Sequence, residues 1–110
     1  MIRTVLTMKV REGCAEAFER AWRDAARVAG DYPGCLGQTM LRSPEDPLRY
    51  TITADWASSE SLTAYQLSED RKSLSATLDR LRESATKSLL DIVAHVSPPT
   101  ASAPTTKARS

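Results

Sequence analysis

The sequence predicts one α+β domain in which helices cover one face of a four-stranded antiparallel sheet. Three observations lead to this fold class. The chain has 110 residues, 41% of them hydrophobic, which is typical of a single globular domain. Alternating apolar and polar residues predict strands, and apolar residues three or four positions apart predict helices. These patterns follow one another in the order β-α-β-β-α-α-β.

The first half of the chain contains a strand, a helix and a hairpin. Residues 2–10 alternate and predict the first strand. After Gly13, apolar residues at helical spacing continue as far as Ala29, and the segment 30–34 (GDYPG) ends this helix. Strands over 35–42 and 48–56 flank a turn rich in proline and acidic residues, which predicts an antiparallel hairpin.

Two helices and a strand are predicted in the second half. Ser58 is placed to cap a short helix, and Ser68 to cap a longer one. The last strand is expected over residues 88–96. From Ser97 the composition of Pro, Ser, Thr and Ala predicts a disordered tail over 97–110, so the folded domain is expected over 1–96. The short helix holds Leu62 and Tyr65, and the buried stripe of the longer helix comprises Leu74, Leu78, Leu81 and Ala85.

This element order is that of the ferredoxin-like split β-α-β topology. The helices cover one face of such a sheet and leave the other open. A one-sided sheet in a monomer is expected to be polar on its open face, whereas valine and threonine there suit packing against a second sheet. An identical chain is the simplest source of this second sheet, so the sequence predicts a homodimer. The residues expected at the centre of the open face are Val5, Thr7, Thr51, Thr53, Leu89 and Val93.

Composition and motifs exclude several classes of function. The net charge of +1 provides no basic surface for nucleic acid. No apolar run reaches the ~20 residues of a membrane helix, and the N-terminus has no signal-peptide pattern, so we expect a cytoplasmic protein. Cys14 and Cys35 lack metal-ligand spacing, and His95 is the single histidine, so no metal site is expected. The glycines form no dinucleotide or phosphate-binding motif, and we expect no cofactor.

One segment resembles a known family. In residues 56–65, WASSESLTAY, a tryptophan is followed by Ser, Glu, Leu and Ala at every second position. This spacing is similar to that of the antibiotic biosynthesis monooxygenase family, in which the next position, here Tyr65, is commonly histidine. The turn at 33–35 and Glu12-Gly13 before the first helix also resemble that family. The likeness covers residues 2–96.

The resemblance implies a dimeric α+β barrel with a pocket between sheet and helices in each subunit. Several members oxidise a phenolic or anthrone ring to a quinone with O₂ and no cofactor, and others degrade haem. Both groups use a pocket asparagine, and this sequence has none. Ile52 stands where quinone-forming members carry the asparagine, and Gln38, the only neutral amide in the predicted strands, is a candidate substitute. Haem-degrading members use a histidine on the helix after the tryptophan, so haem chemistry is disfavoured.

Trp56 and Tyr65 are the candidate catalytic residues. The hydroxyl of Tyr65 could hydrogen-bond a substrate oxygen or stabilise a phenolate, and the indole N–H of Trp56 needs an acceptor, which a ligand oxygen could supply. Both residues are equally consistent with simple core packing. Arg71 and Lys72 are expected on a solvated helix face, although an arginine at a pocket mouth could hold a carboxylate. The candidate substrate-binding residues are Phe18, Trp22, Gln38, Met40, Tyr50, Ile52, Leu62 and Leu78.

The predicted function is therefore a homodimeric, cofactor-independent monooxygenase that oxidises an aromatic polyketide intermediate with O₂. A deprotonated polycyclic phenol reacts with O₂ in an apolar slot that favours the anion and excludes water. Two alternatives remain at this level. One is a polyketide cyclase or aromatase on the same fold. The other is a non-catalytic dimer that binds a small hydrophobic molecule or assists a partner oxygenase.

Overall fold

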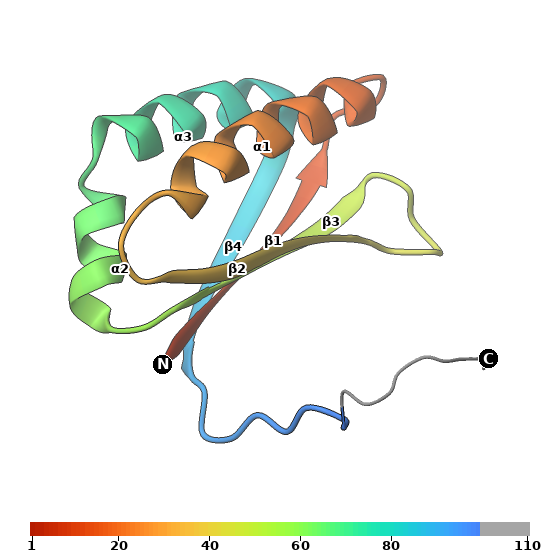
Figure 1. Cartoon of the computed structure of the whole chain (residues 1–110). Coiled ribbons are helices and arrows are strands. Elements are labelled where there is room, and N and C mark those ends of the chain that lie inside the picture. Colours follow the sequence, from red (N-terminus) through yellow and green to blue (C-terminus); the bar gives the residue numbers. More distant parts are fainter. Residues whose placement is uncertain (100–110) are drawn as a thin grey trace.

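The computed structural model describes residues 1–99, and Figure 1 shows their arrangement. Seven elements follow one another as the sequence predicts: β1 (Ile2–Val10), α1 (Ala15–Gly30), β2 (Cys35–Arg42), β3 (Arg49–Trp56), α2 (Ser59–Gln66), α3 (Glu69–Leu81) and β4 (Arg82–Asp91). The predicted tail lies outside the described residues from position 100 onward. The division into a 1–96 domain and a tail stays a prediction.

The four strands form one antiparallel sheet in the order β2-β3-β1-β4. The two strands that are neighbours in the hairpin, β2 and β3, pair directly, and β1 lies between β3 and β4. Figure 1 shows α1 and α3 side by side over one face of this sheet, with α2 at one end and the opposite face uncovered. The predicted ferredoxin-like α+β fold is confirmed.

Local signals account for the ends of the helices. The Ser58 hydroxyl accepts a hydrogen bond of 3.2 Å from the N–H of Ser61 at the start of α2. The Ser68 hydroxyl accepts one of 3.1 Å from the N–H of Arg71 at the start of α3. Each hydroxyl satisfies an N–H that has no partner within its helix, so both predicted N-caps are confirmed.

The core lies between the sheet and the helices, and it has two parts. One cluster joins the middle of the sheet to α1 and α3. The second lies at the α2 end, where the side chain of Trp56 is only 2% exposed. Because residues paired across antiparallel strands point to the same face, the pairs Leu6–Ile52 and Met8–Tyr50 place the apolar side of β1 toward the helices, as predicted. The first cluster comprises Met8, Val10, Phe18, Tyr50, Ile52 and Leu78, and the second Ala29, Trp56, Leu62 and Tyr65.

The boundary between α3 and β4 differs from the prediction. The helix ends at Leu81, because the carbonyl of Leu81 accepts a hydrogen bond of 2.9 Å from the N–H of Arg11, which follows β1. The chain then enters the sheet at once, so Ala85 pairs with Met8 as part of a strand and does not belong to the helical stripe. The last strand therefore covers Arg82–Asp91, six residues earlier at its start than expected.

The faces of β4 are also the reverse of the prediction. Leu89 pairs with Thr4 on the helix side, whereas Leu90 pairs with Arg3 on the open face. Val93 and His95 lie beyond the strand, and Val93 is exposed. Apolar residues occur at consecutive positions here, so alternation alone did not distinguish the two faces. Nearly the whole of β4 is exposed on both sides, since it is an edge strand that the helices do not fully cover.

Candidate functional site

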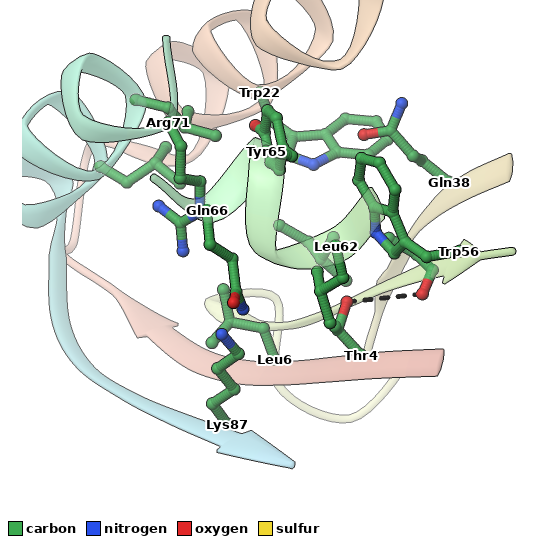
Figure 2. A pocket seen from close by; sticks show the side chains of 14 residues that line it. Thr4, Leu6, Trp22, Gln38, Trp56, Leu62, Tyr65, Gln66, Arg71 and Lys87 are labelled. Carbon is green, nitrogen blue, oxygen red and sulfur yellow. Dashed lines mark hydrogen bonds between the residues drawn. The ribbon is translucent and has the colours of Figure 1, made fainter. Parts of the chain in front are cut away.

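A cavity of about 80 Å³ lies between the sheet and the helices, and it is partly open to solvent. Residues of all four strands form its floor, and residues of α1, α2 and α3 its walls. Figure 2 shows how these side chains converge from separate elements. Its lining residues are Thr4, Leu6, Trp22, Gln38, Ile52, Ala54, Trp56, Leu62, Tyr65, Gln66, Arg71, Leu74, Leu78 and Lys87.

Aromatic rings form the wall of this pocket at its α2 end. The ring of Tyr65 stacks on the indole of Trp56, with 5.2 Å between ring centroids and 22° between planes. Tyr65 also packs against Tyr32 in a T-shaped arrangement, with 5.0 Å between ring centroids and 73° between planes. Trp22 reaches the same pocket from α1. These rings provide the flat apolar surfaces that an aromatic ligand needs.

Three polar hydrogens in this wall have no protein acceptor. Within residues 1–99 the indole N–H groups of Trp22 and Trp56 and the hydroxyl of Tyr65 donate no hydrogen bond, and yet none of these atoms is sealed from solvent. Figure 2 shows the Tyr65 hydroxyl beside Trp22 on the helix side of the pocket. Burial raises the pKa of Tyr65 above its ordinary value, although the positive charge of Arg71 opposes this. The phenol is therefore protonated at neutral pH and can donate to a ligand oxygen.

Most residues that were singled out in the sequence meet at this pocket. Both candidate catalytic residues line it, as do five of the eight candidate substrate-binding residues, namely Trp22, Gln38, Ile52, Leu62 and Leu78. Phe18, Met40 and Tyr50 do not. Phe18 and Tyr50 belong to the first core cluster, and Met40 packs against it. The hydroxyl of Tyr50 donates a hydrogen bond of 2.6 Å to Glu19. Helical spacing in α1 and alternation in β3 put Phe18 and Tyr50 in the layer between sheet and helices but did not fix their distance from the pocket, and alternation in β2 did not show which face carries Met40.

Gln38, the candidate substitute for asparagine, is already engaged. Its side-chain N–H donates a hydrogen bond of 2.8 Å to the carbonyl of Ala26 in α1. This contact fixes the amide against the helix and leaves its oxygen as an acceptor. Ile52, at the place of the family's asparagine, contributes only an apolar surface to the pocket floor.

Lys87 and Gln66 line the pocket although the sequence did not predict it, and Arg71 lines it, as in the alternative to the solvated helix face. Lys87 was missed because the last strand was expected to begin after it; its alternation with Ala85 and Leu89 was the available signal. Burial and, second, the positive charge of Arg71 lower the pKa of Lys87 below its ordinary value. Although much of the Lys87 side chain is exposed, its ammonium group is thus partly desolvated and close to another cation.

The described residues contain no group of three or more His, Cys, Asp and Glu side chains positioned to hold a metal ion. The single histidine, His95, follows β4 and its Nε2 lies 3.2 Å from the hydroxyl of Ser97, away from the pocket. None of the helices in the part of the chain described is long and apolar enough to cross a bilayer.

Comparisons with known proteins agree with this architecture. The family model described as "Antibiotic biosynthesis monooxygenase" matches residues 1–77. SnoaB, a cofactor-independent oxygenase from Streptomyces nogalater, has a solved structure that matches with a TM-score of 0.79 at 18% identity, covering 86% of this chain and 95% of that one. PA3566 from Pseudomonas aeruginosa matches with a TM-score of 0.75 at 22% identity, covering 84% and 94%.

A conserved protein from Methanosarcina mazei matches with a TM-score of 0.76 at 18% identity, covering 81% of this chain and 89% of that one. At such identities these likenesses establish a shared fold. No match was found among proteins of curated function.

Proposed function

Because the chain belongs to the antibiotic biosynthesis monooxygenase family, we propose that it oxidises an aromatic phenol or anthrone of polyketide type with O₂, without a cofactor. One observation carries the proposal: a pocket walled by aromatic rings contains three N–H or O–H donors for which residues 1–99 provide no acceptor. Such a site binds a flat ring and stabilises negative charge on its oxygen.

Oxidation by O₂ without a cofactor needs an electron-rich substrate anion and a site that excludes water. Loss of a proton from the substrate gives a phenolate or carbanion, which transfers an electron to O₂ far more readily than the neutral ring. Combination of the two radicals forms a carbon–oxygen bond and, after protonation, a hydroperoxide. Loss of water from the hydroperoxide then gives the carbonyl, so a ring CH₂ and O₂ yield C=O and H₂O. The apolar walls protect the peroxide from solvent.

The proposed roles follow from the donors. The N–H of Trp56 and the hydroxyl of Tyr65 hydrogen-bond the substrate oxygen and lower the free energy of its anion. Trp22 contributes its indole from the helix side, and Leu62, Ile52 and Leu78 provide the apolar surface. The Trp56–Tyr65 stack holds both rings in one orientation, which reduces the entropy lost when the substrate binds.

The homodimer is part of the same proposal. On the open face of the sheet, Val5, Thr7, Thr51 and Thr53 are half-buried although no helix covers them. Leu41 and Leu90 are more than half exposed at the two sides of this face. A second copy that packed its own sheet here would bury these residues together.

The function can be tested by measuring dissolved oxygen and quinone absorbance after purified protein is mixed with anthrone. We expect enzyme-dependent uptake of one O₂ for each quinone formed, at a rate that dialysis against a metal chelator leaves unchanged. Heat-denatured protein provides the control for spontaneous oxidation. Saturable binding of anthrone without oxygen uptake would contradict the oxygenase and favour a binding module. Cyclisation of a poly-β-ketone without oxygen uptake would favour the cyclase.

A further inference from the structure

Two cationic side chains lie at the boundary between the pocket and an adjoining hollow, which we call the mouth of the pocket. Arg71 projects from the first turn of α3 and Lys87 from the helix-facing side of β4. Both residues, together with Gln66, line the inner cavity and also an outer hollow of about 560 Å³. A ligand that passes from the outer hollow into the cavity must therefore pass Arg71 and Lys87. Figure 2 shows their nitrogen atoms and the Gln66 amide on the same side of the pocket, across from Trp56.

No carboxylate in residues 1–99 pairs with either cation. The hydroxyl of Ser75 is the side-chain partner of Arg71. The acids nearest in sequence to Arg71 are committed elsewhere. Asp70 accepts a hydrogen bond of 2.7 Å from the hydroxyl of Tyr32, and Glu69 pairs with Lys72 at 3.3 Å.

The carboxylate that lines the outer hollow, that of Asp79, is also paired. Asp79 lies 2.7 Å from Arg82. The mouth therefore carries an excess of positive charge that no carboxylate of residues 1–99 neutralises. The lowered pKa of Lys87, caused first by burial and then by Arg71, reflects the same arrangement. Two like charges held close together in a partly desolvated place are unfavourable until an anion binds between them.

The sizes of the two spaces define the shape of the ligand. Ligand pockets usually measure about 300–1,000 Å³. The inner cavity, at about 80 Å³, admits only part of a polycyclic compound, whereas the outer hollow has room for the remainder. A compound with an aromatic end inside and an anionic end at the mouth would satisfy both regions.

We propose that the substrates of this pocket are aromatic carboxylic acids, with the ring against Trp22 and Trp56 and the carboxylate bound by Arg71 and Lys87. This substrate class rests on the proposed function, because the same pocket is the site of both. The planar guanidinium can bind a carboxylate through two hydrogen bonds, and the lysine adds a point charge. Gln66, between them, can donate a further hydrogen bond.

Binding of 2-naphthoate and of its neutral counterpart 2-naphthamide, measured by calorimetry on the full chain, tests the proposal. We expect 2-naphthoate to bind at least about tenfold more tightly, because a hydrogen bond to a charged group stabilises the complex more than a neutral one. Arg71→Gln and Lys87→Gln should each reduce this preference severalfold, and the double variant should abolish it. Arg80→Gln is the matched control, because Arg80 lies on the same helix but lines neither space.

Equal affinities for the two probes, or no saturable binding of either, would overturn the proposal. So would a preference for 2-naphthoate that survives in the double variant. Thermal unfolding of each variant shows whether it is folded, and a residual affinity for 2-naphthamide shows whether the ring site is intact. The proposed function fails separately. The protein could prefer 2-naphthoate in this way and yet consume no O₂ with any anthrone or aromatic acid. That outcome would support the anion site and contradict the oxygenase activity.

Discussion

At the scale of single residues, two tyrosines on neighbouring elements have opposite surroundings. The hydroxyl of Tyr65 has no acceptor within the described chain and borders the pocket. That of Tyr50 donates a hydrogen bond of 2.6 Å to Glu19 in the core. The hydroxyl of Tyr65 can therefore bind a ligand, whereas that of Tyr50 stabilises the fold.

Replacement of each tyrosine by phenylalanine should separate these roles. For Tyr65→Phe we expect turnover of anthrone to fall about tenfold or more, because a donor to the substrate anion is lost, with little change in stability. For Tyr50→Phe we expect unchanged turnover and a loss of about 1 kcal/mol in the free energy of unfolding. Oxygen uptake and urea unfolding measure the two effects. Equal turnover of wild type and Tyr65→Phe would remove Tyr65 from the mechanism.

The indole N–H of Trp56 can be tested in the same way. Trp56→Phe keeps an aromatic surface against Tyr65 but lacks the N–H, so we expect a lower kcat for anthrone oxidation. The smaller ring also leaves a cavity, which should lower the free energy of unfolding by about 1–3 kcal/mol. Measurements of kcat at a temperature well below the unfolding transition separate these effects. An unchanged kcat would assign Trp56 to packing alone.

At the scale of elements, the turn before β2 is held against the start of α2. Gly34 has a φ of +88°, a region that residues with a Cβ rarely adopt. A Cβ at Gly34 would also collide with the side chain of Ser61. The carbonyl of Gly34 accepts a hydrogen bond of 2.8 Å from Ala57, which follows β3. The turn thus positions the segment that carries Trp56 and Tyr65.

We expect Gly34→Ala to lower the free energy of unfolding by about 1–3 kcal/mol, because it introduces backbone strain and a steric collision. Gly37→Ala is the control: no atom lies within 4 Å of a Cβ placed there, and its backbone has no positive φ. Its stability should remain close to that of wild type. Urea unfolding provides the comparison. Equal destabilisation by both variants would show that the close approach to α2 is not the cause.

An ion pair joins β1 and β3 on the open face of the sheet. The guanidinium of Arg3 donates two hydrogen bonds to Asp55, of 2.7 and 2.9 Å. The hydrogen bond from Arg3 is the main reason that the pKa of Asp55 is lowered. A carboxyl group whose pKa is lower in the folded state stabilises the protein at pH values above the ordinary aspartate pKa of about 4. This stabilisation is lost as the pH falls through the pKa that the group has in the folded protein.

The stability difference between wild type and Asp55→Asn should therefore depend on pH. We expect wild type to be the more stable at pH 6, and the difference to shrink below about pH 4 as Asp55 becomes protonated. Urea unfolding at several pH values measures it. A difference that stayed constant from pH 6 to pH 2 would show that the ion pair does not contribute through its charge.

At the scale of the whole molecule, the proposed homodimer would form through the open face of the sheet. We expect a mass near twice 12.1 kDa in light scattering. Val5→Lys should shift the protein to monomer, because it places a charge at the centre of the proposed interface. Thr63→Lys adds the same charge to the exposed side of α2 and should leave the dimer intact. A monomeric wild type at micromolar concentration would refute the dimer.

Much of this molecule follows from local patterns. The alternation in β1 and the helical spacing in α1 depend on neighbours in the chain, so these elements and the serine caps of α2 and α3 were predictable. The same patterns assigned Trp22, Trp56 and Tyr65 to the layer between sheet and helices. They also placed Phe18 and Tyr50 there, since periodicity identifies a face but not the position along it. For Met40 the alternation in the second strand did not show which face meets the helices.

The amino-acid order alone was sufficient for the fold class, the helix-facing side of β1 and the residues of the aromatic wall, because these follow from the periodicity of each segment and from the order of the segments along the chain. The pairing of distant segments settled the rest. A hydrogen bond from Arg11 to the carbonyl of Leu81 ends α3 early, and the register of β4 on β1 then places Lys87 opposite Leu6. Lys87 and Arg71 are sixteen positions apart and meet only because strand register and helix packing, which act between elements, bring them to one pocket mouth.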